Sequence, residues 1–308
     1  MSYNLKQQHI PPVQVYLNSK FADFSMNPKA KSHGVFVFYE PLIRIPNGYK
    51  YLISLNNAEI PNSIYNVNDN NNNIIFGYYL SGTFYPLIID GISSQGLIQL
   101  NPGIYSADEI AILLSNLNFI IQLRAGIDDT LVINTVYDGN FNKFKFTIAS
   151  CSVPSSYLTG VKLCIKPFNN VPNPIFGFSG QNILFDLVVN NSGYSDYNVD
   201  VTGTRAVFFK VLNLHTSGFD SKYKMSGNIL ARIPMNAEPN YMIYWINNTN
   251  YKTIQQTKNL NILEILITDS DHQPIDFNGV DWSCSIQIDV LGQDEEEYRA
   301  DVNQFNLS

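Results

Sequence analysis

The sequence between residues 50 and 66, KYLISLNNAEIPNSIYN, is the stretch that most restricts how this chain can fold. Residues 51–55 form an apolar run that is typical of a β-strand, and the two asparagines that follow predict a turn. Residues 58–65 contain Pro61, which favours an extended backbone. The one acid, Glu59, stands beside apolar Ile60 and belongs to no polar cluster. We therefore expect the central strand and corner of a β-sandwich here.

The composition predicts a folded protein whose surface contacts other proteins. Of the 308 residues, 45% are hydrophobic and only 15% are charged, whereas ordinary domains have about 25% charged residues. The chain also has 19 Tyr and 19 Phe, and aromatic residues are enriched in strands and at interfaces. A surface with few charges suits a protein that packs against copies of itself. The length allows about two domains, or one large β domain with an insertion.

The net charge of the chain argues against a role in coating nucleic acid. The net charge is −7, which argues against coating nucleic acid, because that binding needs concentrated Lys and Arg. We expect no sequence-specific nucleic-acid partner. The acidic run at residues 294–297 is interpreted as part of a solvated tail.

The cysteines and the apolar segments indicate where the chain resides. Cys151, Cys164 and Cys284 cannot all pair within one chain and show no C-x-x-C spacing, so we expect buried thiols in a reducing compartment. The N-terminus lacks the apolar core of a signal peptide, and no window approaches about 18 apolar residues. We therefore predict a chain without a membrane span that is not secreted by the usual route.

The first third of the chain reads as an arm followed by strands. Residues 1–31 form a polar N-terminal arm with an apolar alternation at Val13, Val15 and Leu17, which is interpreted either as a floppy terminus or as an arm that pairs with a neighbouring subunit. Residues 34–45 predict a strand that Pro41 kinks or confines to an edge. With residues 50–60, which follow a Pro-Asn-Gly turn signal, this strand predicts either an antiparallel hairpin or a sheet-to-sheet corner. Residues 74–80 form a further strand after an Asn-rich loop.

Residues 82–180 change character and predict an inserted α+β domain. Ser106 and Glu109 form a capping box, and Ile110, Leu113, Leu114 and Leu117 recur at helical spacing behind it. Strands at 97–100, 130–136 and 143–149 accompany this helix, and the last two are joined by an Asp-Gly turn.

The β pattern resumes after residue 180. The alternation of residues 283–290 places Cys284, Ile286, Ile288 and Val290 on one face. About three strands before the insertion and five or six after it give eight or nine, which predicts a jelly roll. The predicted fold is mainly β, a single jelly-roll β-sandwich of residues 32–81 and 181–292 with the inserted small α+β domain, followed by an acidic tail at 293–308. The later strands are expected at 183–189, 205–212, 228–233, 241–246, 262–268 and 282–290.

The sequence offers no reaction centre. The four histidines, His9, His33, His215 and His272, show no H-x-x-x-H spacing. Residues 269–272, DSDH, lack the glycine and the distal glutamate of a calcium loop, so a turn is the favoured interpretation. We predict no catalytic, cofactor-binding or metal-binding residue, no cofactor and no enzymatic activity.

Two further polar or glycine-rich segments receive structural interpretations. Asp128 and Asp129 precede a strand and are interpreted as a turn. Residues 175–180, IFGFSG, have the wrong spacing for a dinucleotide fold and are interpreted as a hinge between insertion and sandwich, with Phe176 and Phe178 as plugs.

The order of several phrases resembles a known family. NNAEIPNSIYNVN is followed by LIQLNPGIYSADEIAILLSNL, a hairpin, GFSG and LEILITDSDHQPIDFNGVDWSCSIQIDVL. This order is similar to penton or minor capsid proteins of virophages, Sputnik-like ones among them, and of related large dsDNA viruses. The resemblance implies a single jelly roll in an icosahedral shell, five copies around each vertex, with the inserted domain outside.

The resemblance also implies partners and location. A homopentamer at the capsid vertex of the virion would contact the neighbouring major capsid protein after assembly in the host cytoplasm. The alternative function is a receptor- or glycan-binding module, in which the inserted domain recognises a host or partner-virus surface. A β-sandwich hydrolase lacks any pair of carboxylates or triad in this sequence.

Overall fold

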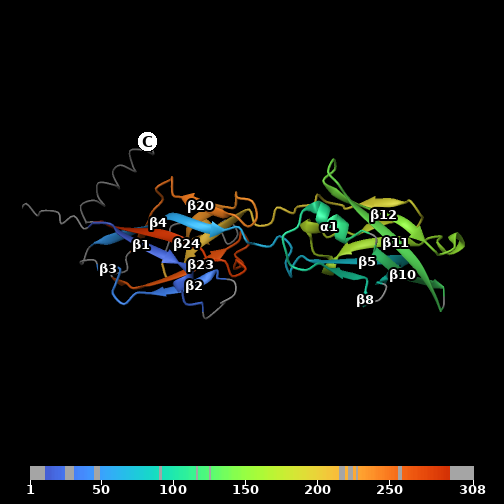
Figure 1. The fold of residues 1–308 in the computed structure, drawn as a ribbon, viewed down its shortest axis with the longest axis horizontal. Helices are drawn as coiled ribbons and strands as arrows, with labels where there is room; N and C mark the ends of the chain where they lie inside the picture. The colour runs from blue at the N-terminus through green and yellow to red at the C-terminus, as the bar shows by residue number, and fades with distance from the viewer. Residues whose placement is uncertain are drawn as a thin grey trace, which may run out of the picture. The chain divides into compact units, whose positions relative to one another are not determined.

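The computed structural model describes residues 11–24, 31–44, 49–89, 92–115, 117–124, 126–214, 219–220, 225–226, 228–255 and 259–291. Two compact units make up the chain. Unit 1 combines Met1–Ile64 with Thr204–Ser308, and unit 2 is the intervening Tyr65–Gly203. In Figure 1 the blue strands from the start of the chain accordingly lie beside orange and red strands from its end, all within unit 1.

Within the described residues, unit 1 is built from strands and one short 3-10 helix, η1 (Ser19–Phe21). Its strands are β1 (Val13–Asn18), β2 (His33–Val37), β3 (Ile43–Arg44), β4 (Lys50–Pro61), β16 (Ala206–Val211), β17 (Phe219–Asp220), β18 (Met225–Ser226), β19 (Ile229–Pro234), β20 (Met242–Ile246), β21 (Thr253–Gln255), β22 (Asn259–Leu260), β23 (Ile262–Thr268) and β24 (Ser283–Leu291).

The two main sheets of unit 1 have the strand order of a jelly roll. One sheet runs β1-β24-β4-β20, with β21 also on β4, and the other runs β19-β16-β23-β2. Along the chain, the first long strand therefore pairs with the last, the second with the next to last, and so on inward, always antiparallel. A long hairpin folded over itself into two sheets gives this pattern. The predicted fold class is confirmed.

β4 is the central strand predicted from residues 50–66, but it contains no turn. It continues from Lys50 to Pro61, and the register with β24 shifts where Leu55 and Asn57 face Ile286 and Ser285. Asn56 is thus the extra residue of a β-bulge. The bulge explains why the inward-facing residues change from odd numbers before it, as in Ile53, to even numbers after it, as in Ala58.

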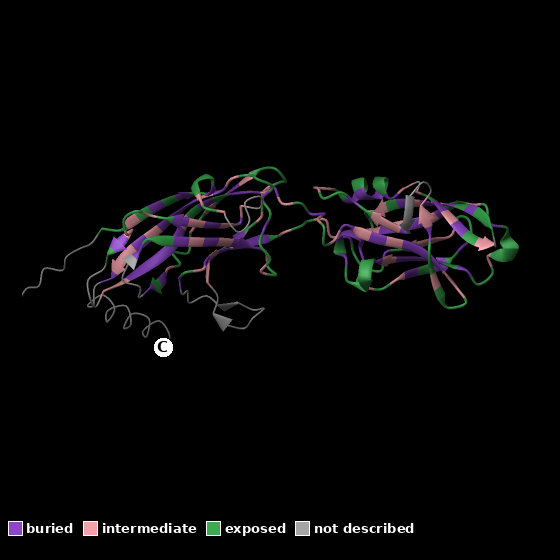
Figure 2. Cartoon of the chain, turned by 90° about the horizontal axis from the view of Figure 1, so that it is seen from below, coloured by how far each residue is buried: buried purple, intermediate pink, exposed green. Residues whose placement is uncertain are grey.

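The core of unit 1 lies between its two sheets. Trp282, just before β24, is 1% exposed and has edge contacts with Phe36 of β2 and Phe209 of β16, at 6.1 and 5.7 Å between ring centroids. This indole therefore joins one sheet to the other. Figure 2 shows buried purple segments alternating with exposed or intermediate ones along these strands, as expected for strands with one buried face.

Two expectations for the start of the chain are corrected or refined. Within the range predicted as an arm, β1 pairs with β24 of its own chain from Val13 to Asn18, because Val15 and Leu17 fit the inner face of the sheet. The predicted strand at 34–45 is broken into β2 and β3, and the break includes Pro41, which cannot donate to a ladder. Residues 1–10 and the acidic tail at 293–308 lie outside the described residues.

Unit 2 contains one α-helix, α1 (Ala107–Leu113), and three 3-10 helices within the described residues, η2 (Ser155–Tyr157), η3 (Phe168–Asn170) and η4 (Pro174–Phe176). Its strands are β5 (Asn73–Leu80), β6 (Thr83–Pro86), β7 (Ile88–Ile89), β8 (Ile92–Gln95), β9 (Leu97–Gln99), β10 (Leu117–Arg124), β11 (Ile127–Asp138), β12 (Lys143–Cys151), β13 (Lys162–Pro167), β14 (Ile183–Asp186) and β15 (Ser192–Tyr194).

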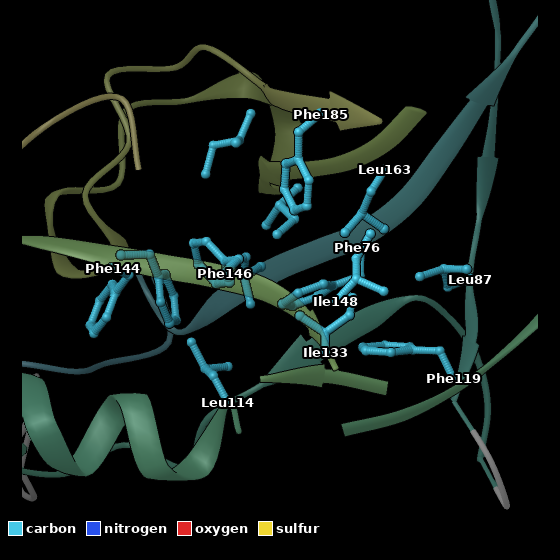
Figure 3. Packing of buried hydrophobic residues seen from close by; sticks show 14 of the residues in the cluster. Phe76, Leu87, Leu114, Phe119, Ile133, Phe144, Phe146, Ile148, Leu163 and Phe185 are labelled. Carbon is cyan, nitrogen blue, oxygen red and sulfur yellow. The ribbon is translucent and has the colours of Figure 1, made fainter. Parts of the chain in front are cut away.

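The strands of unit 2 form two sheets around a second core. One runs β14-β13-β5-β6, with β9 on β5, and the other runs β15-β12-β11-β10-β7-β8. Figure 3 shows Phe76 and Leu163 of the first sheet facing Phe146 and Phe119 of the second. The rings of Phe76 and Phe119 stack at 5.1 Å. The inserted unit thus carries more strand than the sequence indicated.

The predicted helix is present. Ser106 accepts a hydrogen bond from the Glu109 N–H, and the Glu109 carboxylate accepts one from the Ser106 N–H at 2.7 Å. Ile110 and Leu114 enter the core, as Figure 3 shows for Leu114. The predicted apolar face of the helix is shorter than expected, however, because Leu113 is half exposed and Leu117 already begins β10.

The unit boundaries differ from the predicted ones at 81/82 and 180/181. The chain leaves the sandwich after Ile64 and returns at Thr204. β5, which was assigned to the sandwich, pairs with β6, β9 and β13, and β14 pairs with β13, so both belong to unit 2. An apolar alternation predicts a strand but does not indicate which sheet the strand joins.

Trp282→Ala should destabilise unit 1 by about 3–5 kcal/mol, because it leaves a cavity between the two sheets. Urea unfolding followed by circular dichroism measures this loss. The control Tyr241→Ala removes a ring that is 64% exposed and should change the free energy of unfolding by less than about 0.5 kcal/mol. Equal effects of the two substitutions would contradict the role given to Trp282.

Candidate interaction surfaces

The DSDH segment is a turn, as predicted. The Asp269 carboxylate accepts hydrogen bonds from the backbone N–H groups of Asp271 and Gln273, at 2.8 and 2.9 Å. The His272 N–H donates to the Asp269 carbonyl. These bonds close the connection between β23 and β24. The described residues contain no group of three or more His, Cys, Asp or Glu side chains that could hold a metal ion.

The other polar residues considered in the sequence also have structural partners. His33 of β2 contacts the Glu264 carboxylate at 2.8 Å. Asp128 and Asp129 are not a turn, because both lie in β11. Asp129 is 3% exposed, and the Arg124 guanidinium donates two hydrogen bonds to it, at 2.5 and 3.0 Å.

Residues 175–180 are not a hinge between the units. They lie inside unit 2, where Gly177 has a φ of 71° and ends η4. Phe176 and Phe178 are instead buried in the second core, where they pack among other apolar side chains. His9 and His215 lie outside the described residues.

The thiols behave as small apolar side chains. Cys164 and Cys284 are buried, and Cys151 is half buried. Burial raises the pKa of Cys164 to about 11, which keeps this thiol protonated near neutral pH. In the described part of the chain, no helix is long and apolar enough to cross a membrane.

Unit 1 carries exposed apolar side chains on the flank formed by β1, η1 and β2. Antiparallel bridge bonds between Asp23 and Val35 close this flank. Tyr39 is fully exposed, and Tyr16, Phe21 and Val37 are each more than 60% exposed. We call these four residues the β1–β2 flank.

The opposite flank, formed by β19, β20 and β21, is also apolar. β19 ends one sheet and β20 ends the other, at the side away from β1 and β2. Its exposed side chains include Tyr244, at 74%, and Ile246 and Ile254, both at least half exposed. A pocket of about 620 Å³ lies beside them, lined by Phe208, Ile229, Trp245 and Tyr251 among others. We call this surface the β19–β21 flank.

Between the two flanks, the outer face of the sheet β1-β24-β4-β20 is polar in its middle. Tyr16, Ser285, Asn57 and Ile246 lie in one row across β1, β24, β4 and β20. In the next row the Ser283 hydroxyl donates to the Glu59 carboxylate at 2.8 Å. Exposed apolar residues are therefore concentrated on the end strands, where they lie at the two lateral edges of the sandwich.

Unit 2 carries a cluster of rings around the β11–β12 turn. Phe141 lies in this turn, and its ring meets the Tyr194 ring of β15 edge-on, at 5.6 Å and 67°. The Lys145 ammonium lies 5.8 Å from the Tyr194 ring centroid. The Tyr194 hydroxyl donates to the Asp138 carboxylate at 3.3 Å. We call Phe141, Tyr194, Lys145 and Asp138 the aromatic cluster.

The solved structures that resemble this chain include a viral penton protein. The crystal structure of the mavirus penton protein matches with a TM-score of 0.47 and 10% sequence identity, over 92% of this chain and 100% of that chain. Values this low carry no argument about what this chain does. No protein-family model matches the sequence, and no curated protein matches it.

The abundance of aromatic residues is visible in the sequence, but these surfaces are not. Tyr16 and Tyr244 stand in alternating strands, where the pattern indicates an outward side chain. These side chains lie on two opposite flanks because of the order of the strands in each sheet, and the sequence pattern does not reveal that order. The aromatic cluster depends on the pairing of β12 with β15, whose residues are about 50 positions apart.

Asp281 should make stability sensitive to acid. Its carboxylate accepts hydrogen bonds from Lys31 and Ser19, each at 2.7 Å. The bond from Lys31 is the largest cause of a lowered Asp281 pKa, and the bond from Ser19 is the second. The stabilisation is complete above the unfolded-state pKa of about 3.9 and is lost as the pH falls through the folded-state value.

Asp281→Asn should therefore lose less thermal stability than the unchanged protein between pH 5 and pH 3. Thermal unfolding at both pH values measures this difference, with Asp69→Asn, in an exposed loop, as the control. An unchanged pH dependence in Asp281→Asn would contradict the contribution of this carboxylate.

Proposed function

We propose that the chain is a structural virion protein that forms homopentameric capsomers, or pentons, at the fivefold vertices of an icosahedral capsid. In this proposal it contacts the neighbouring major capsid protein, assembles in the host cytoplasm and performs no enzymatic reaction. The order of sequence phrases supports a virophage or related dsDNA virus, Sputnik-like virophages included. The jelly roll of unit 1 is compatible with this role, since viral capsid proteins are among the proteins that use it.

The observation that carries the proposal is the pair of apolar flanks on opposite edges of one sandwich. A ring needs two different surfaces on each copy, so that one surface of a copy contacts the other surface of the next. The β1–β2 flank and the β19–β21 flank meet this requirement. Single exposed apolar residues are normal on protein surfaces, but here they gather on the end strands of the two sheets and on the segments next to them.

The two flanks also differ in a complementary way. Tyr39 and Phe21 protrude from the β1–β2 flank, whereas the β19–β21 flank contains the apolar pocket beside Trp245. Exposed rings of one copy entering the pocket of the next would bury aromatic surface at the centre of each contact, where binding energy is usually concentrated. The geometry favours a head-to-tail contact over a symmetric dimer.

A second function is favoured by the aromatic cluster of unit 2. Exposed rings beside charged side chains suit a module that recognises a receptor or glycan on a host or partner-virus surface. Jelly rolls also occur in lectin domains, but the cluster lies on the inserted unit. The two functions use different surfaces and are compatible in one protein.

Tyr39→Asp and Ile246→Asp should each weaken assembly at least tenfold, because each introduces a charge into one side of the proposed contact. Sedimentation velocity over a concentration series measures the association of the full chain. Tyr157→Asp, which alters an exposed ring of unit 2, is the control and should assemble like the unchanged protein.

Circular dichroism confirms that each variant is folded before it is compared. Pentamers of the unchanged protein that dissociate in both flank variants support the proposal. A monomer at every concentration, or flank variants that assemble as the unchanged protein does, would overturn it.

A further inference from the structure

We propose that the aromatic cluster of unit 2 is a carbohydrate-binding site for a neutral pyranose unit of a surface glycan. The inference deepens the second proposed function, recognition of a surface receptor or glycan, by naming its site and ligand class. It is independent of the assembly of unit 1, since its residues all belong to β11, β12, β15 and the turn at 139–142.

Tyr194 forms the floor of the site. It pairs with Lys145 of β12, which in turn pairs with Val136 of β11. Its hydroxyl reaches Asp138, also on β11, so the side chain crosses β12. A ring that crosses a strand in this way lies along the sheet surface. The Lys145 ammonium lies over the ring, and 38% of the Tyr194 residue remains exposed to solvent.

Phe141 forms a wall beside this floor. Its ring is 62% exposed and stands at 67° to the Tyr194 ring. The two rings therefore make an apolar corner with one flat and one upright side. The C–H groups on one face of a pyranose carry partial positive charge, and aromatic faces carry negative charge, so the corner suits a sugar ring lying on Tyr194.

Polar side chains belong to the same strands and turn as the two rings. Asp138 and Lys143 are directly opposite each other on β11 and β12, and exposed Asn140 lies in the turn between them. A carboxylate, an ammonium and an amide together offer both acceptors and donors to sugar hydroxyls. A purely apolar protein partner would leave these groups without water, which is costly.

The local charge indicates a neutral sugar. Lys143 and Lys145 bring two positive charges, and Asp138 and Asp196 bring two negative ones. Asp196 is tied into the cluster, because the Lys143 ammonium donates to its backbone carbonyl at 3.1 Å. Cationic donors make the strongest hydrogen bonds to a carboxylate or sulfate, and here the two cations are balanced by two carboxylates that would repel an anionic sugar.

The site is formed before any ligand binds. Contacts with Lys145 and Asp138 hold Tyr194 in place, and the Tyr137 hydroxyl donates to the Asn142 side chain at 2.7 Å across the base of the turn. The backbone N–H of Asn140 donates to the Asp138 carboxylate. Ordering these side chains on binding therefore costs little free energy.

The test applies the full chain to an array of neutral, sialylated and sulfated oligosaccharides, followed by titration calorimetry with the neutral oligosaccharide that gives the strongest signal. Tyr194→Ala removes the floor and should weaken binding at least tenfold, and Phe141→Ala should weaken it severalfold. Tyr194→Phe keeps the ring and should retain most of the affinity. Tyr157→Ala, an exposed ring elsewhere in unit 2, should bind as the unchanged protein does.

The outcomes separate the site from the function. Binding to neutral glycans that Tyr194→Ala abolishes and Tyr194→Phe preserves supports the proposal. Glycan binding that survives Tyr194→Ala overturns the site but leaves recognition by unit 2 standing. Binding restricted to sialylated or sulfated glycans overturns the ligand class. No binding to any glycan overturns both the site and the glycan-recognition function, whatever sedimentation shows about assembly.

Discussion

Antiparallel pairing of β4 with β24 and β20 is the interaction on which the rest of unit 1 depends. It joins the early part of the chain to residues more than 180 positions later. At the end of β4, the Asn62 N–H donates to the Tyr241 carbonyl and the Ser63 hydroxyl donates to the Phe277 carbonyl. The chain therefore leaves the sandwich from a fixed point.

An insertion as large as unit 2 is compatible with this pairing for two reasons. The entropy cost of closing a loop grows only with the logarithm of its length. Unit 2 also has its own core between its own two sheets, with rings such as Phe76 and Phe146 in contact at 6.1 Å. Neither unit needs the other to bury its apolar strand faces, and each is free to present a separate surface.

The sequence predicted what depends on local chemistry. The capping box at Ser106, the alternation of residues 283–290 and the strand character of residues 50–61 were all visible, because each needs only neighbouring residues. The bulge at Asn56 was mistaken for a turn, since two asparagines favour either. The assignment of β5 and β14 to the sandwich was wrong, because pairing partners far along the chain decide which sheet a strand joins. The interaction surfaces are the least predictable part, since they combine strand order with exposure.

Head-to-tail contact between the two apolar flanks is the central claim, and disulfide trapping between copies tests it most directly. One preparation carries Tyr39→Cys and another carries Ile246→Cys, and each is oxidised alone and after mixing. The account predicts a covalent dimer in the mixture and none in either preparation alone, because each contact joins two different flanks. Dimers in a single preparation, or none in the mixture, would contradict it.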